Sequence, residues 1–372
     1  MLPEVINIYK AIFCSFVCIA LLFAFATLSS AVNCSAKSAI LVEFDSGEIV
    51  YEKNAQEMLP MASTTKIMTA IVAIENCPLD KYVTITSDAV GIEGSSLYLN
   101  EGERYTMRDL LYGLMLQSAN DAAVAIAIEC SGSIEGFAEQ MNRKVNELGL
   151  SNTHFMNPNG LDSDGHYTTA SDLARITSYA LKNPEFSKIV STKQYKFGDK
   201  VIFNHNKLLS IYDGCVGVKT GFTKKSGRCL VSAAERNGVK FVCVTLSDTD
   251  DWRDHTSLLD LGFDLYKKVD ICKEGRLTYE LNCTGGEKKT VKISNRDALS
   301  LTMKKDMPQV NCVIETKGRS VLFCPVNEGA NLADAVFYAE DKVIARVPLY
   351  AIETVPAKEF KKSIRDYFNF FK

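Results

Sequence analysis

A serine and a lysine three residues apart could together carry out nucleophilic chemistry. Ser63 and Lys66 follow Pro60, and apolar residues at helical spacing begin directly after them, so both side chains are expected on one face of a first helical turn, with Cβ atoms roughly 5–6 Å apart. A lysine that opens a buried helix is partly desolvated, which favours its neutral amine. A neutral amine beside a hydroxyl can act as its base. The alternative is a helix-capping serine beside a lysine that reaches solvent.

Two further polar groups could complete such a site. Ser118 and Asn120 flank Ala119 where one apolar helix is expected to end and another to begin, so their short side chains could point together into a cleft. The run Lys219-Thr220-Gly221-Phe222 is extended in character, and its glycine indicates a close approach of another backbone or a ligand. The chemistry would therefore need a helix start, a helix junction and a strand to meet.

The elements that must position these residues indicate an α+β fold. Ile67, Ala70, Ile71 and Ile74 follow the spacing of a helix that is apolar nearly all round, and such a helix is buried. The dipeptide Asn237-Gly238 separates two apolar runs and is a strong hairpin signal, which places Lys219-Thr220-Gly221 on a strand of an antiparallel sheet. Residues 37–269 are therefore expected to form helices packed on an antiparallel sheet.

The composition changes near residue 270. Short alternating runs bounded by turn residues continue to about residue 355 and predict a small β-sandwich domain. Residues 356–372 combine aromatic with basic side chains, which predicts an amphipathic helix lying on a membrane surface. The alternative is a helix docked on the second domain.

The N-terminus predicts export. An uncharged run from Ala11 to Val32 follows Lys10 and leads into small residues, so residues 1–36 are interpreted as a signal peptide. The run is also long enough for an uncleaved membrane anchor. In either case the body of the chain is expected at the outer face of the cytoplasmic membrane or in the cell wall.

Composition excludes several classes of protein. The chain has 372 residues, 47% hydrophobic and 23% charged, and a formal net charge of −3 without a long basic run, which argues against a nucleic-acid partner. Its 12 cysteines include no Cys-x-x-Cys pair, so a zinc site is not expected. Mostly free thiols are expected, with a possible bridge between Cys312 and Cys324. Surface or structural roles are expected for the four histidines, which are His154, His166, His205 and His255.

The three motifs stand in chain order as Ser63-x-x-Lys66, Ser118-Ala119-Asn120 and Lys219-Thr220-Gly221, the set found in penicillin-recognising serine enzymes. The sequence around these motifs resembles that of the low-molecular-mass penicillin-binding proteins that are serine-type D-alanyl-D-alanine carboxypeptidases. The resemblance covers nearly the whole chain after the leader. It implies a penicillin-binding or β-lactamase-like domain, a β-rich second domain and an amphipathic tail.

The resemblance also implies roles. Ser63 would be the acylated nucleophile and Lys66 its proton acceptor, Ser118 would relay a proton, and Asn120 would hold Lys66 and the substrate amide. Lys219 and Thr220 would bind the terminal carboxylate of a peptidoglycan stem peptide ending in D-Ala-D-Ala. Gly221 belongs to this substrate-binding motif, and the backbone N–H groups of Ser63 and Phe222 would form the oxyanion hole. β-Lactam antibiotics would acylate the same serine, and no metal or cofactor is required.

Some features leave alternatives open. In some relatives an arginine late in the first domain assists the carboxylate, and Arg253 is a candidate whose spacing leaves its role undecided. A class A β-lactamase would need a Glu-x-x-Leu-Asn segment between the second and third motifs, and none is present. A D,D-endopeptidase acting on peptide cross-links, or a module that senses penicillin by acylating and stalling, remain alternatives.

Overall fold

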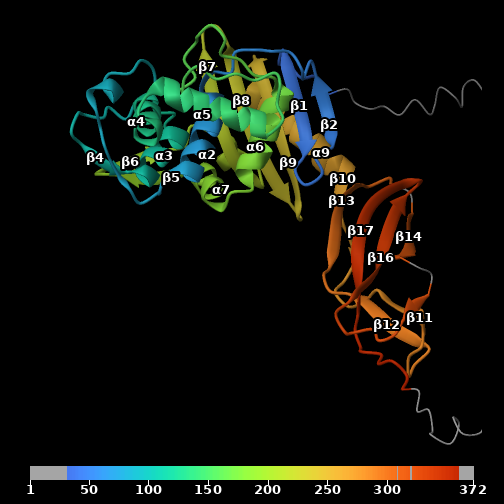
Figure 1. The fold of residues 1–372 in the computed structure, drawn as a ribbon. Coiled ribbons are helices and arrows are strands. Elements are labelled where there is room, and N and C mark those ends of the chain that lie inside the picture. Colours follow the sequence, from blue (N-terminus) through green and yellow to red (C-terminus); the bar gives the residue numbers. More distant parts are fainter. Residues whose placement is uncertain (1–31, 308, 319–320, 360–372) are drawn as a thin grey trace, which may run out of the picture.

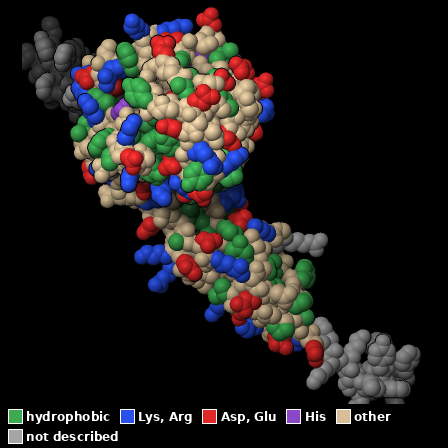
Figure 2. Space-filling view, turned by 90° about the vertical axis from the view of Figure 1, so that its left-hand side faces the viewer, with side chains coloured by type: hydrophobic (Ala, Val, Ile, Leu, Met, Phe, Trp, Pro, Cys, Tyr) green, Lys and Arg blue, Asp and Glu red, His purple; other side chains and the backbone are tan. Residues whose placement is uncertain are grey.

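The computed structural model describes residues 32–307, 309–318 and 321–359 (Figure 1). Most of the predicted leader and of the predicted tail helix lie outside these ranges. The described part forms two domains, a rounded first domain and a narrower second one (Figure 2). Within the described ranges, no helix combines the length and apolar character that a bilayer crossing requires.

The first domain combines helices with a five-stranded antiparallel sheet, which confirms the predicted α+β class. The sheet order is β2-β1-β9-β8-β7, formed by β1 (Ser38–Glu43), β2 (Ile49–Lys53), β7 (Cys215–Thr223), β8 (Gly227–Arg236) and β9 (Val239–Asp248). Two small hairpins pair β3 (Tyr82–Thr84) with β4 (Arg104–Thr106) and β5 (Gln194–Phe197) with β6 (Lys200–Phe203). The helices are α2 (Lys66–Asn76), α3 (Met107–Leu116), α4 (Asn120–Ser131), α5 (Ile134–Glu147), α6 (Ala170–Leu181), α7 (Pro184–Ser191), α8 (Leu208–Ile211) and α9 (Asp251–Leu265).

The hairpin at Asn237-Gly238 forms as predicted and sets the pairing of β8 with β9. Both residues have positive φ, 51° and 75°, the conformation that a tight two-residue turn requires. Strand β8 therefore pairs with β9, and β7 adds to the other side of β8 with Thr220 opposite Leu230. The edge strand β7 is thereby placed next to the helices.

Each face of the sheet contributes to a separate core. Along β8, Val231 and Ala233 pack with helices α2 to α7, whereas Leu230 and Ala234 pack with α9 on the opposite face. This alternation follows from the two-residue period of a strand. Figure 1 shows the larger group of helices on one face and α9 on the other. The larger core surrounds α2, so the helix that begins at Lys66 is buried.

The second domain is built from strands, as predicted. A six-stranded sheet of order β14-β16-β17-β12-β11-β15 faces the two-stranded sheet β10-β13. The strands are β10 (Tyr266–Cys272), β11 (Thr278–Thr284), β12 (Thr290–Asn295), β13 (Leu299–Lys304), β14 (Val310–Thr316), β15 (Leu322–Phe323), β16 (Asn331–Ala339) and β17 (Lys342–Ala351). Helix α9 passes directly into β10, which links the domains.

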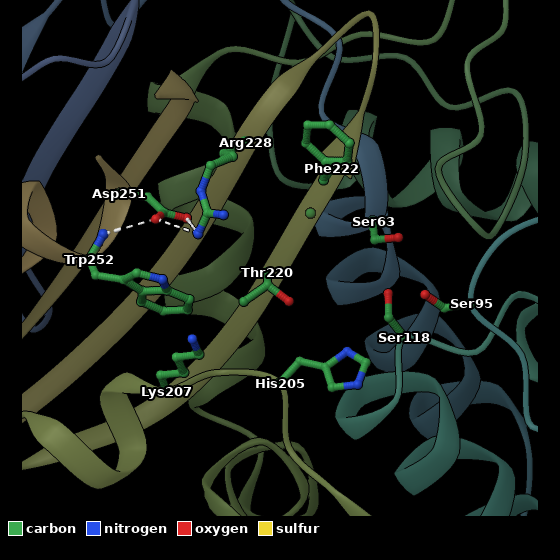
Figure 3. Close-up of a pocket in the computed structure, with 11 residues that line it drawn as sticks. Ser63, Ser95, Ser118, His205, Lys207, Thr220, Phe222, Arg228, Asp251 and Trp252 are labelled. Atoms are coloured by element: carbon green, nitrogen blue, oxygen red, sulfur yellow. Dashed lines mark hydrogen bonds and ion pairs between the residues drawn. The ribbon is translucent and has the colours of Figure 1, made fainter. Parts of the chain in front are cut away.

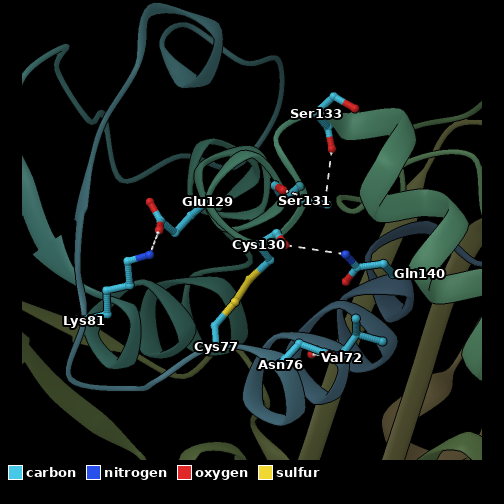
Figure 4. Close-up of a disulfide and its surroundings, with 10 residues drawn as sticks. Val72, Asn76, Cys77, Lys81, Glu129, Cys130, Ser131, Ser133 and Gln140 are labelled. Carbon is cyan, nitrogen blue, oxygen red and sulfur yellow. Dashed lines mark hydrogen bonds and ion pairs between the residues drawn. A yellow bond between two sulfur atoms is a disulfide. The ribbon is translucent and has the colours of Figure 1, made fainter.

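A disulfide that the sequence did not predict joins Cys77, at the end of α2, to Cys130, near the end of α4 (Figure 4). Gln140 of α5 donates to the Cys130 carbonyl beside it. The remaining described cysteines are free. They include Cys312 and Cys324, so the bridge considered between these two does not form.

Candidate active site

Ser63 lies in a 3₁₀ turn, η1 (Ala62–Thr65), that leads directly into α2. The alternative role of Ser63 as a helix cap is wrong, because the cap position belongs to Thr65 and no side chain caps that end. The turn is sharp: Ala62 has φ of +47°, in the left-handed region that alanine rarely adopts. The Ser63 hydroxyl is therefore free of the backbone and available to Lys66.

Lys66 is fully buried and holds three polar contacts. Its Nζ lies 2.9 Å from Ser63 Oγ, 2.7 Å from Asn120 Oδ1, and within hydrogen-bonding distance of the Asn159 carbonyl oxygen. The Asn120 amide is oriented by its Nδ2, which donates to the Glu93 carbonyl at 2.5 Å. The Asn120 and Asn159 oxygens can only accept, so a neutral amine spends both N–H bonds on them. Its lone pair is then left for the serine hydroxyl.

Burial favours the neutral amine of Lys66. Desolvation lowers the pKa of Lys66 well below its ordinary value, and the nearby charge of Lys219 lowers it further. The carboxylate of Asp121 opposes this shift. The lowered pKa suits Lys66 to accept the proton of Ser63, as a general base requires.

Ser118 and Asn120 reach the site from the junction between α3 and α4, as predicted. Ser118 is buried, has φ of +60°, and lines the same pocket as Ser63. Asn120 opens α4, and its backbone N–H donates to the Ser95 carbonyl at 2.7 Å. The tight junction therefore places the Ser118 side chain in the pocket and the Asn120 side chain against Lys66.

Strand β7 forms the opposite wall. Lys219 is fully buried and its Nζ donates to the Thr220 carbonyl at 2.8 Å, while burial lowers the pKa of Lys219 to about 7. A Cβ on Gly221 would lie 3.0 Å from the Ser63 backbone nitrogen, so the absence of a side chain lets β7 approach the nucleophile turn. Phe222 is largely exposed at the rim. The structure thus brings all eight predicted site residues together.

The pocket between these walls has a volume of about 370 Å³. Its lining includes six residues that the sequence analysis did not assign to the site, which are Ser95, His205, Lys207, Arg228, Asp251 and Trp252 (Figure 3). His205 is exposed, as expected for a surface histidine, and it lines the pocket, where partial desolvation and the charge of Lys219 lower its pKa. No group of His, Cys, Asp and Glu suited to a metal ion occurs in the described ranges.

Arg228 lies at the end of the pocket beyond Thr220. Its Nη2 donates to both carboxylate oxygens of the buried Asp251, at 2.7 and 2.9 Å, and its guanidinium stands 5.7 Å from the Trp252 ring centre. Arg253, the candidate from sequence, is instead exposed and pairs with Asp250 and Asp254. It does not line this pocket.

Two family models and several characterised proteins match this sequence. The family model described as D-alanyl-D-alanine carboxypeptidase matches residues 25–250, and the model of the penicillin-binding protein 5 C-terminal domain matches residues 266–357. D-alanyl-D-alanine carboxypeptidase DacF of Bacillus subtilis is 32% identical, over 90% of both chains. DacA of Escherichia coli is 31% identical, over 89% of this chain and 86% of that protein.

Solved structures show the same fold. Penicillin-binding protein 5 from Haemophilus influenzae superposes with a TM-score of 0.71 at 29% identity, over 87% of this chain and 98% of that one. The Streptomyces K15 DD-transpeptidase is 36% identical with a TM-score of 0.60, over 63% of this chain and 98% of its own. The first similarity extends through both domains, whereas the second covers a smaller part of this chain.

Proposed function

The chain belongs to the D-alanyl-D-alanine carboxypeptidase family and is a serine-type carboxypeptidase of the low-molecular-mass penicillin-binding proteins, and on that premise we propose the role of each site residue. Ser63 Oγ attacks the carbonyl carbon of the terminal D-Ala-D-Ala amide while Lys66 takes the hydroxyl proton. The observation that carries this assignment is the buried Lys66 amine, 2.9 Å from Ser63 Oγ with its two N–H bonds engaged elsewhere.

The remaining groups act on the intermediate and on the leaving group. The backbone N–H groups of Ser63 and Phe222 bind the oxyanion, which is usually the largest catalytic contribution. The close contact at Gly221 supports this arrangement, because it brings the two backbones together. Ser118 relays the proton from Lys66 to the departing amine, and Asn120 holds Lys66 and the substrate amide. D-alanine leaves, and water then hydrolyses the ester on Ser63.

The substrate carboxylate binds at the cationic end of the pocket. Thr220 lines one side of it with Lys219 buried directly beside Thr220, and Arg228 lies beyond them with a guanidinium whose position is fixed by Asp251. We assign to Arg228 the supporting role that the sequence analysis considered for Arg253. A peptide ending in D-Ala-D-Ala carries one negative charge there, as do β-lactam antibiotics, so both fit this end.

Replacing the nucleophile tests this assignment. Ser63→Ala should abolish D-alanine release from a diacetyl-Lys-D-Ala-D-Ala peptide and covalent labelling by fluorescent penicillin, whereas Ser191→Ala on α7 should change neither. Labelling that persists in Ser63→Ala would remove Ser63 from the mechanism. Labelling without steady D-alanine release in the unaltered protein would favour the stalled sensing module, and release from a cross-linked dimer would favour the endopeptidase.

We also propose an exported protein whose leader ends before Asn33 rather than at Ala36. Residues 34–36 are built into the first domain: Ala36 is fully buried, Ser35 Oγ donates to Asp248 at 2.7 Å, and Lys53 donates to the Cys34 carbonyl at 2.7 Å. A cut after Ala36 would remove these contacts. The small residues at 29–31 provide an earlier cleavage region.

We propose that residues 356–372 hold the protein to the membrane surface from the far end of the second domain. Most of this segment lies outside the described residues. The chain leaves the second domain at the end remote from the first (Figure 1), and Lys358 N–H still donates to the Gly285 carbonyl there. Deleting residues 359–372 should move the protein from membrane to soluble fractions, and an unchanged distribution would refute the anchor.

A further inference from the structure

His166 is buried directly behind the nucleophile turn and belongs to none of the three sequence motifs. It is 6% exposed and its ring packs edge-on against Phe155. Its Nδ1 lies 3.0 Å from the Met156 backbone nitrogen, and its Nε2 lies 2.8 Å from Thr65 Oγ1. Both ring nitrogens therefore form hydrogen bonds, Nδ1 with the loop at Met156 and Nε2 with Thr65, the residue before Lys66.

The partners fix which nitrogen carries the proton. The Met156 N–H can only donate, so Nδ1 must accept, and the neutral ring carries its hydrogen on Nε2. Nε2–H therefore donates to Thr65 Oγ1, and the Thr65 hydroxyl donates onward to the Ala62 carbonyl at 2.8 Å. Burial lowers the pKa of His166 to about 4, with smaller contributions from His154 and Lys66, so the ring is neutral at physiological pH. These contacts form a directed chain of hydrogen bonds.

The chain of hydrogen bonds ends on the most constrained residue of the turn. Ala62 has φ of +47°, which costs on the order of 1 kcal/mol for alanine and persists only where neighbours hold it. A Cβ on Gly160 would lie 2.0 Å from the Ala62 carbonyl oxygen and 2.9 Å from Thr65 Oγ1, so the loop presses on the same two groups. The direction of the Ala62 carbonyl sets the path of the backbone into Ser63.

The same loop also holds Lys66. Asn159, next to Gly160, supplies the carbonyl that accepts from Lys66 Nζ. His166 connects this loop, through Met156, to the turn that carries Ser63. The serine and its base are therefore held by one loop, and His166 is one of the connections between that loop and the turn.

We propose that His166 is a positioning residue that acts through Thr65 to hold Ser63 at the distance from Lys66 that acylation requires. The proposal rests on the proposed function in taking Ser63 as the nucleophile. His166 touches neither the substrate nor the reacting atoms. Its loss should slow formation of the acyl-enzyme and leave substrate binding unchanged.

Two amide substitutions separate this role from that of a buried histidine that only fills space. The shorter amide of His166→Asn places its oxygen near the position of Nδ1, so this variant can keep the Met156 contact but cannot reach Thr65. The longer amide of His166→Gln places its nitrogen near the position of Nε2, so this variant can donate to Thr65 but loses Met156. A second matched pair acts on the relay itself: Thr65→Ser keeps the hydroxyl, and the nearly isosteric Thr65→Val removes it.

The rate constant for acylation by fluorescent penicillin, kcat and KM for D-alanine release, and the melting temperature should be measured for each variant. We expect His166→Asn and Thr65→Val each to lower the acylation rate and kcat about tenfold with KM unchanged, the effect of one hydrogen bond. His166→Gln and Thr65→Ser should stay within about threefold of the unaltered protein. The double variant His166→Asn/Thr65→Val should lose no more than either single variant, because both remove the same contact.

The proposal is overturned if His166→Gln falls as far as His166→Asn, if the two losses add, or if KM rises instead of kcat falling. Should both histidine variants fail to fold, the comparison of Thr65→Ser with Thr65→Val decides, and equal rates would overturn the proposal. Failure of the proposed function would give a different result, because the unaltered protein would then show neither D-alanine release nor labelling at Ser63.

Discussion

Removing the Arg228 side chain should damage recognition of the substrate carboxylate more than it damages the fold. Arg228 is partly exposed in the pocket and is held by Asp251, whose side chain is 4% exposed. A hydrogen bond to a charged group contributes about 1.5–3 kcal/mol. Losing one should lower kcat/KM between about 10-fold and about 150-fold, since about 1.4 kcal/mol corresponds to a factor of ten.

The partner of Arg228 adds a second effect. In Arg228→Ala the buried Asp251 side chain loses its guanidinium partner and keeps the Trp252 backbone N–H at 3.0 Å, so a carboxylate without a compensating cation faces the substrate anion. Arg228→Ala/Asp251→Asn should therefore recover part of the loss. Arg228→Lys, which keeps a charge but not the planar fork, should lose less than Arg228→Ala.

The assay compares D-alanyl-D-alanine peptides that have a free or an amidated C-terminus. In the unaltered protein the free acid should be preferred, and in Arg228→Ala that preference should fall by the same factor as kcat/KM for the acid. Arg253→Ala, on the exposed side of α9, serves as the matched control and should leave the preference intact. A preference that is unchanged in Arg228→Ala, or lost in Arg253→Ala, would refute the assignment of the carboxylate site.

Burial, the disulfide and the N-terminal contacts each support one further prediction. The pKa of Lys219 is about 7, so its charge is lost as pH rises above that value and kcat/KM should fall above about pH 7. On the acid side kcat/KM should also fall, because Lys66 gains a proton there. A steady rise of kcat/KM to pH 10 would contradict this prediction. Cys130→Ser should lower the free energy of unfolding in urea by about 4 kcal/mol, given the sequence separation of 53 residues between the bonded cysteines, and reductant should have no further effect on that variant. Mass spectrometry of the exported protein should find an N-terminus at or before Asn33, and a start at Lys37 would show that the contacts of Cys34 and its neighbours are dispensable.

The site was predictable from sequence where local chemistry determines it. The 3.6-residue period after Ser63 and the turn at Asn237-Gly238 each depend on neighbours in the chain, so the nucleophile helix and the strand that carries Lys219 were located correctly. The helix junction at Ser118 could be recognised for the same reason. These signals place each motif in an element whose type is fixed by short-range structure.

Contacts between distant elements could not be predicted in the same way. Arg228 reaches the pocket because β7 and β8 pair with Phe222 opposite Arg228, a register that the bulges in this sheet make unreadable from the chain alone. Helix phase then turns Arg253 outward and Asp251 inward. His166 carried no signal, since a single histidine between loops is compatible with many structures. The sequence analysis placed the end of the leader at residue 36, although the small residues near 31 are equally suited to cleavage.

The disulfide between Cys77 and Cys130 makes the geometry of the site depend on the redox state of the surroundings. Helix α2 begins at Lys66 and α4 begins at Asn120, and the disulfide joins the two helices near their opposite ends. A shift of one helix along the other would change the 2.7 Å separation between Lys66 Nζ and Asn120 Oδ1. Protein purified from a reducing cytoplasm would lack the disulfide, so its turnover should be compared with that of the oxidised protein.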